Sequence, residues 1–214
     1  MKIIDFTHTI EEEMPVYPGT GTPKLHPASS FETDGFRETL LTMFSHTGTH
    51  MDAPSHIFEN GVSLDKMDCC QFIGSAVVMD CTDIVDGKKI DISYIDKNRF
   101  LAERAEFLLF RTGWDKKWGS DDYFKNYPCI TDEVANFIIS TNKKGVGFDL
   151  ISVDPIDDSN LTIHKKLLSQ DTIIIIENLC NLEHAGKGMF TLVAAPIKFS
   201  NSDGAPIRAL GILD

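Results

Sequence analysis

The sequence has few features of a disulfide-bonded, membrane-spanning or nucleic-acid-binding protein. Its 5 cysteines are irregularly spaced and form no CxxC pair, which argues against a disulfide framework and a thiolate zinc site. No apolar run is longer than Ile173–Ile176, whereas a membrane span needs about 20 residues. The sequence has 20 basic and 32 acidic residues, and the resulting net charge of −12 disfavours binding to phosphate backbones or anionic lipid. We therefore expect no nucleic acid and no membrane among the partners.

Other familiar signals are also missing. The first residues, Met1–Asp5, lack the hydrophobic core of an export signal, which together with the cysteine pattern predicts a reducing, cytoplasmic location. Each cysteine is then expected to be a small buried side chain. The glycines form neither a P-loop nor a dinucleotide fingerprint, and Ser45 lacks a GxSxG elbow. The sequence thus offers no nucleotide site and no serine nucleophile.

The composition is that of a chain with a sizeable core. Of its 214 residues 42% are hydrophobic, and the absence of repeats and long linkers predicts one domain over residues 1–214. Helices are expected over 131–144 and 159–169, with a short one over 91–98. Segments rich in β-branched and aromatic residues predict strands at 3–6, 38–44, 74–80, 107–110, 147–151, 172–176, 191–199 and 207–212. Because strands outnumber helices without strict alternation, we predict an α/β fold with a mixed sheet and peripheral helices.

The segment His46–His56 carries the densest chemistry. It reads His-Thr-Gly-Thr-His-Met-Asp-Ala-Pro-Ser-His. Threonine, glycine and proline are poor helix formers, so we predict a strand end turning into a loop. Imidazoles and a carboxylate suit Zn²⁺, Mn²⁺ or Fe²⁺, with open positions left for catalysis. Gly48 would allow close approach to the ion and the threonines would orient its ligands. The alternative is a polar surface turn.

Two distant residues are further candidates. On the helix predicted at 159–169, His164 shares a face with Leu161 and Leu168, so it is either a ligand or a core histidine bonded to a carbonyl. Glu177 directly follows the strand predicted at 172–176. A carboxylate there is costly unless it meets a cation or several donors, or unless it lies exposed just beyond the strand.

These residues resemble a known family. The pattern His46-x-Gly48-Thr49-His50-x-Asp52-Ala53-Pro54-x-His56 is similar to the HxGTHxDxPxH signature of the metal-dependent cyclase family, which includes bacterial kynurenine formamidases and isatin hydrolases. The likeness covers most of the chain. Asp5–Ile10 resembles the opening strand of the family, Tyr17–Gly19 its WPGD or YPGD loop, and Phe110–Trp114 its RTGW-type strand end.

The resemblance implies a site and an assembly. His46, His50 and Asp52 would bind one ion, and Asp52 would bridge to a second ion held by His164 and Glu177. The cofactor would be one or two divalent ions, Zn²⁺ ahead of Mn²⁺. His56 would be the general acid and base, and Tyr17 would stack on a small-molecule substrate. The implied fold is a cyclase-like swivelling β/β/α domain, assembled as a homodimer or homotetramer whose neighbouring subunit can line the pocket.

The residue types support metal-assisted hydrolysis of an amide carbonyl, with an imidazole moving the protons. The resemblance implies an amidohydrolase, first of all an arylformamidase of tryptophan catabolism that converts N-formyl-L-kynurenine and water to L-kynurenine and formate. A cyclic amide, imide or lactone hydrolase of the isatin hydrolase type is the alternative, and a non-catalytic metal-binding family member is the third. Departures from the family pattern are Tyr17 in place of tryptophan, Thr20 in place of an acid and the additional Gly21–Thr22. They lie near the expected substrate pocket.

Overall fold

A closed mixed sheet forms the centre of the molecule. The computed structural model describes residues 1–85 and 87–213. The main sheet has the strand order β1-β10-β4-β8-β7-β6-β5-β9, and β9 also pairs with β10, so that the sheet closes on itself. The strands are β1 (Lys2–Asp5), β4 (His50–Asp52), β5 (Ile73–Asp80), β6 (Phe107–Arg111), β7 (Gly145–Phe148), β8 (Ile174–Glu177), β9 (Phe190–Pro196) and β10 (Gly204–Leu213).

Strand direction confirms the predicted mixed sheet. Strands β5, β6, β7 and β8 run parallel, whereas the other strand pairings of this sheet are antiparallel. Side chains of β6 alternate between two cores: Leu108 and Phe110 pack with the helices, while Phe107 and Leu109 pack inside the closed sheet. Burial on both faces explains why this strand reads as an uninterrupted apolar run.

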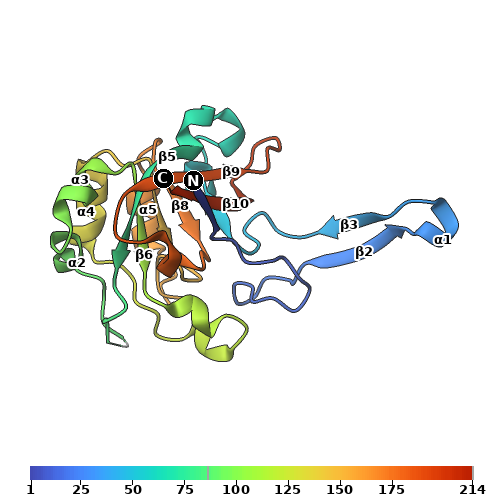
Figure 1. The fold of residues 1–214 in the computed structure, drawn as a ribbon, viewed down its shortest axis with the longest axis horizontal. Helices are drawn as coiled ribbons and strands as arrows, with labels where there is room; N and C mark the ends of the chain where they lie inside the picture. Colours follow the sequence, from blue (N-terminus) through green and yellow to red (C-terminus); the bar gives the residue numbers. More distant parts are fainter. Residues whose placement is uncertain (86, 214) are drawn as a thin grey trace.

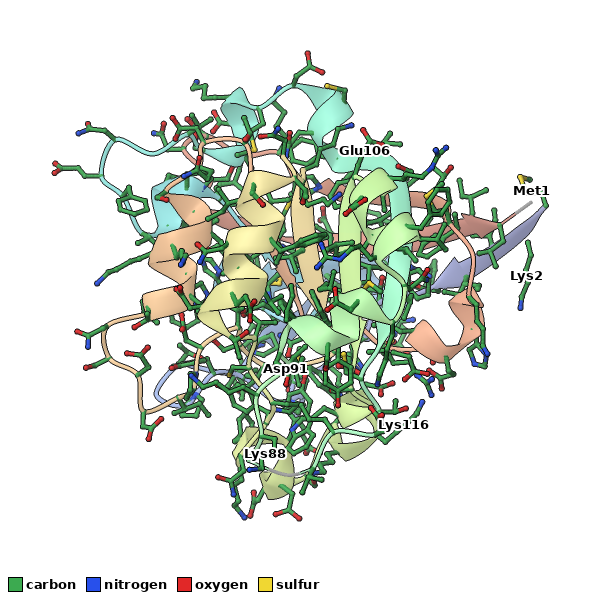
Figure 2. The ribbon with its side chains drawn as sticks, turned by 90° about the vertical axis from the view of Figure 1, so that its left-hand side faces the viewer. Met1, Lys2, Lys88, Asp91, Glu106 and Lys116 are labelled. Atoms are coloured by element: carbon green, nitrogen blue, oxygen red, sulfur yellow. The ribbon has the colours of Figure 1, made fainter. Side chains whose placement is uncertain are left out.

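Helices cover the outer face of the parallel strands (Figure 2). They are α2 (Ile92–Asp96), α3 (Arg99–Arg104), α4 (Asp132–Ser140) and α5 (Thr162–Leu168). Helix α4 begins after Thr131, whose side chain accepts a hydrogen bond from the Val134 amide, as the sequence predicts. Helix α5 begins later than predicted, because Leu161 has a left-handed φ of 50°. Short 3₁₀ helices are η1 (Pro54–His56), η2 (Leu64–Lys66), η3 (Cys69–Phe72), η4 (Trp114–Lys117), η5 (Asp121–Phe124) and η6 (Leu182–Ala185).

A long hairpin projects from the body of the molecule (Figure 1). It consists of β2 (Lys24–Ser29), α1 (Phe31–Asp34) and β3 (Glu38–Thr42), which we call the arm. None of the residues in these three elements is buried, although several are large and apolar. The sequence predicts β3 but not β2, because Pro27 interrupts the β2 pattern.

Burial tests the expectation for the cysteines. Cys81, Cys129 and Cys180 are buried as expected, but the expectation is wrong for Cys69 and Cys70, which η3 places at the surface. Within residues 1–85 and 87–213, no helix has the length and apolar character needed to cross a membrane.

Candidate metal centre

Strand β4 is the frame of the site. It lies between β8 and β10 in antiparallel register, with His50 opposite Glu177 and Asp52 opposite Gly204. The predicted strand end that turns into a loop is found at Asp52, where β4 ends and the chain passes into η1 with His56. The segment also begins in a loop, at His46, which the sequence did not indicate. Three residues are too few for a recognisable strand pattern, so only pairing with two neighbours defines this strand.

Five residues predicted as ligands come together around β4. His46, His50 and Asp52 form one group and Asp52, His164 and Glu177 a second, with the ligand atoms of each group within 4.8 Å of one another. Oδ1 of Asp52 lies 2.7 Å from Nδ1 of His46 and 3.3 Å from Nε2 of His50. Nε2 of His164 lies 3.3 Å from Oε1 of Glu177. Asp52 therefore belongs to both groups, in the arrangement of a shared ligand.

The polar atoms fit a divalent cation. Asp52 is only 1% exposed, and its Oδ2 is buried without a hydrogen-bond partner, 3.6 Å from Nε2 of His164. Burying an unpaired carboxylate oxygen is costly. A cation held between this oxygen and the nearby imidazoles would remove that cost. Nitrogen and carboxylate donors are the ligands that Zn²⁺ and Mn²⁺ take in proteins.

Hydrogen bonds behind the ligands orient the imidazoles. His50 donates from Nδ1 to the Gly48 carbonyl at 2.8 Å, and His164 donates from Nδ1 to Oδ2 of Asp154 at 2.8 Å. Both rings therefore present Nε2 to the carboxylates, which is how such outer partners fix a ligand in many metal sites. Asp154 is absent from the sequence-based site because it is remote from the His46–His56 motif, and no pattern around it indicates a partner for His164.

The threonines of the loop before β4 act differently from their predicted role. Gly48 has a left-handed φ of 66°, which favours glycine, and its carbonyl accepts the His50 proton. Thr49 donates to the Asn178 carbonyl at 2.6 Å and Thr47 to the Phe44 carbonyl at 2.8 Å. The two threonines therefore fasten the loop, and the expectation that they orient ligands is wrong.

Opposing effects set the protonation of the cluster. Burial disfavours the charged form of His46, but hydrogen bonds to Asp203 and Asp52 outweigh it and raise the pKa to about 10. Burial likewise opposes charge on His164, while the carboxylates of Asp154, Asp52 and Glu177 around its ring raise its pKa well above the usual value. For His56, burial dominates and lowers the pKa. Burial therefore favours the neutral form of the His56 ring.

A cavity of about 390 Å³ opens onto the ligand atoms. His56, from η1, lines it beside the metal candidates; its ring centroid lies 4.0 Å from that of His46 and 6.2 Å from that of His164. Tyr17 also lines it, as the family resemblance implies, and the Thr20 hydroxyl donates to the Tyr17 carbonyl at 2.7 Å. No lysine or arginine is among the described residues that line the cavity.

The closed mixed sheet and the cluster of candidate ligands together indicate a metal-dependent hydrolase. Comparison with known proteins identifies the family. The Cyclase family model matches residues 4–155, and the chain belongs to this family. Kynurenine formamidase from Bacillus thuringiensis subsp. konkukian is 31% identical over 210 residues, covering 97% of this chain and 95% of the relative. The Bacillus anthracis enzyme of the same name is 31% identical over 212 residues, covering 98% and 96%.

Solved structures share the fold. Isatin hydrolase A from Labrenzia aggregata, bound to benzyl benzoate, superposes with a TM-score of 0.87 at 26% identity, covering 100% of this chain and 94% of that one. A "predicted metal-dependent hydrolase" from Bacillus stearothermophilus superposes with a TM-score of 0.79 at 28% identity, covering 98% and 97%. These likenesses confirm the family and the fold class expected from the sequence.

Metal binding to the cluster should release protons. An ion bound at His46 must displace the proton that this side chain carries below about pH 10, so affinity for Zn²⁺ should rise as the pH rises toward that value. Titration calorimetry in two buffers of different ionisation enthalpy measures the protons released. An affinity that stays constant from about pH 6 to about pH 8 would contradict this expectation.

Proposed function

We propose that this protein is a metal-dependent amidohydrolase, first of all an arylformamidase that hydrolyses N-formyl-L-kynurenine to L-kynurenine and formate. The observation that carries the proposal is the pair of ligand groups sharing Asp52, whose second carboxylate oxygen lacks a partner. Identity of 31% to kynurenine formamidases over nearly the whole chain supports the substrate class.

In this proposal His46, His50 and Asp52 hold one ion, and Asp52, His164 and Glu177 hold a second. We propose Zn²⁺ as the resident metal and Mn²⁺ as its alternative, since both accept imidazole and carboxylate ligands. When bound, such ions lower the pKa of water and polarise a carbonyl oxygen. The protein supplies the fixed ligand positions and a cavity that holds the amide next to them.

We assign the proton transfers to His56. It lies on the cavity wall and outside both groups that contain Asp52. Burial lowers its pKa, so the neutral ring is ready to accept a proton from the attacking water at neutral pH. The same proton can then pass to the leaving nitrogen when the carbon–nitrogen bond breaks. Tyr17 is proposed to pack against the aryl ring of the substrate, because it lines the same cavity.

The direct test is an assay with N-formyl-L-kynurenine. The protein is stripped of metal, reloaded with Zn²⁺ or Mn²⁺, and kynurenine release is followed by absorbance. Metal-dependent turnover with kcat/KM near or above about 10⁴ M⁻¹s⁻¹ is expected for a true substrate. Bound metal without turnover would remove the formamidase assignment, and inactivity on a wider amide and lactone panel would favour the non-catalytic alternative.

A cyclic amide, imide or lactone is the second candidate substrate. The likeness to isatin hydrolase A supports it, and so does the absence of lysine and arginine from the described cavity lining. A neutral ring gains nothing from a cationic partner, whereas the carboxylate of an amino-acid substrate is bound more strongly by one. Isatin in the same assay distinguishes the two candidates.

Replacing His56 should separate catalysis from metal binding. His56→Ala should keep its metal and lose turnover by about 10²–10⁴-fold, the usual contribution of a general acid–base group. Asp52→Ala should lose both, because both ligand groups contain this carboxylate. Metal content and kcat are measured side by side. His184→Ala, an exposed histidine of η6, is the matched control and should behave as wild type.

We also propose a homodimer or homotetramer, formed through the arm, and a cytoplasmic location consistent with the unpaired cysteines. The arm exposes the apolar side chains Phe31, Phe36, Leu40 and Leu41. A two-stranded hairpin without a packed face is marginally stable in water, so contact with a second copy would stabilise it.

Charged residues on the arm should therefore dissociate the assembly. Leu40→Glu combined with Leu41→Glu should give a monomer in light scattering after size exclusion, while wild type elutes as a dimer or tetramer. Phe100→Glu changes an apolar residue on α3 that is even more exposed than Leu40 and Leu41 and lies away from the arm, and it serves as the control. A monomeric wild-type protein, or an unchanged mass for the arm variant, would refute the role of the arm.

A further inference from the structure

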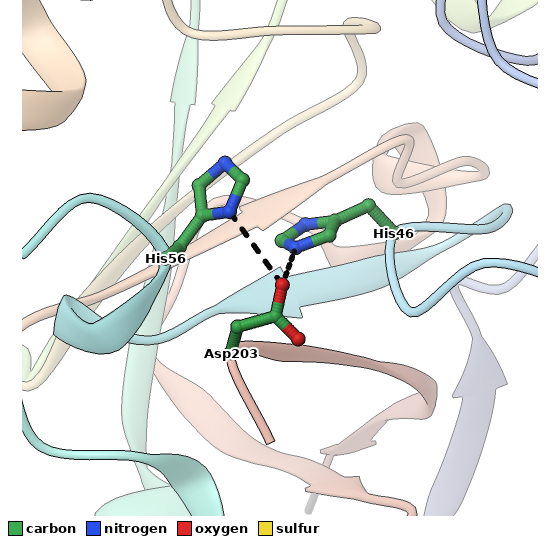
Figure 3. A group of neighbouring side chains, drawn as sticks. All are labelled: His46, His56 and Asp203. Atoms are coloured by element: carbon green, nitrogen blue, oxygen red, sulfur yellow. Dashed lines mark hydrogen bonds and ion pairs between the residues drawn. The ribbon is translucent and has the colours of Figure 1, made fainter. Parts of the chain in front are cut away.

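A carboxylate that the sequence pattern does not indicate lies between two histidines of the site (Figure 3). Oδ2 of Asp203 is 3.0 Å from Nε2 of His46 and 3.8 Å from Nδ1 of His56. Asp203 ends the connection between β9 and β10, 157 residues from His46 along the chain. No local motif could have joined these residues.

The opposite side of the His46 ring faces the metal candidates. Nδ1 of His46 lies 2.7 Å from Oδ1 of Asp52, so Nδ1 is the nitrogen available to an ion. A ligating nitrogen carries no proton, and neutral imidazole then bears its proton on Nε2. That N–H points to Asp203. Asp203 therefore has the position that Gly48 and Asp154 have behind His50 and His164.

We infer that Asp203 is a positioning residue that holds His46 in the Nε2–H form and aims its Nδ1 at the metal centre. This inference rests on the proposed function, because it requires that the Asp52 cluster binds metal. Ligand atoms of His46, His56 and Asp203 also lie within 4.8 Å of one another, so a direct ligand role for Asp203 is the alternative that the experiment must separate. Asp203 faces Nε2 of His46, whereas Asp52 faces Nδ1, so Asp203 stands outside the two groups that share Asp52.

The backbone around Asp203 is built to hold this geometry. The Asp203 carbonyl accepts the Ala53 amide at 2.8 Å, which ties it to the end of β4. The Ser45 hydroxyl donates to Oδ2 of Asp203 at 3.3 Å. The next residue, Gly204, leaves room for the imidazole, since a Cβ there would lie 2.4 Å from Cε1 of His46. The Asp203 carboxylate thus fixes the direction of the His46 ring, and Gly204 leaves the space that the ring occupies.

Metal titration of an Asp203 variant tests the inference. The full-length protein, freed of metal, is titrated with Zn²⁺ as wild type and as Asp203→Ala. We expect one ion to bind about 10–100-fold more weakly in the variant, the usual effect of removing an outer partner, with the other ion within about threefold of wild type. The thermal midpoint should change little, because Asp203 is 43% exposed and its backbone bond remains. Asp80→Ala, a 61% exposed acid at the end of β5, is the matched control.

A second readout examines the tautomer itself. In the Zn²⁺-loaded wild type, long-range ¹H–¹⁵N spectra should show His46 protonated at Nε2, and this proton signal should shift in Asp203→Ala. Gly204→Ala keeps the carboxylate but displaces the ring, so it should weaken the same ion. A general loss of folding would instead weaken both ions and lower the thermal midpoint.

The outcomes separate the two levels of the proposal. A wild type that binds no Zn²⁺ overturns the proposed function and the inference together. A wild type that binds Zn²⁺ and an Asp203→Ala variant that binds it equally tightly overturn only the inference. The third outcome is that Asp203→Ala loses a metal ion that His46→Ala still binds. That result would show that Asp203 is itself a ligand, and it would also overturn the inference.

Discussion

The burial of one carboxylate, that of Asp52, is the constraint around which the rest of the site is arranged. Removing a carboxylate from water is costly unless donors or cations surround it. Three imidazoles approach Asp52, and their attraction for its charged form outweighs the effect of burial and holds its pKa well below the usual value. One oxygen nevertheless stays without a hydrogen-bond partner. A metal centre accounts for both features at once.

The imidazoles depend in turn on groups behind them. Gly48 contributes a carbonyl oxygen, and Asp154 and Asp203 contribute carboxylate oxygens. Each oxygen is hydrogen-bonded to the ring nitrogen that points away from the metal centre. These groups come from the loop before β4, from the segment before α5 and from the end of the β9–β10 connection. The closed sheet brings the three segments together, because β4 pairs with both β8 and β10. The fold is therefore the scaffold that gives each ligand one orientation.

Much of the site follows from local sequence. His46, His50, Asp52 and His56 lie in one short segment, where residue types alone indicate metal chemistry. Glu177 is a candidate because a carboxylate at the end of a buried strand is costly without a partner. The structure confirms that Glu177 is the last residue of the buried strand β8. The tautomers of the histidines, by contrast, depend on partners distant in sequence. Asp203 approaches His46 only because the β9–β10 connection returns to β4.

The sequence by itself determined the mixed α/β class, the approximate strands, the family and the five ligand candidates, because these depend on residue type, periodicity and short spacing. Only the tertiary structure decided that β4 is a strand, that the threonines fasten a loop, that the arm stands free of the body and that Asp203 supports His46. Those features arise from pairings between distant segments. A linear pattern does not encode such pairings, since the free energy that selects them comes from packing and hydrogen bonds made after the chain has folded.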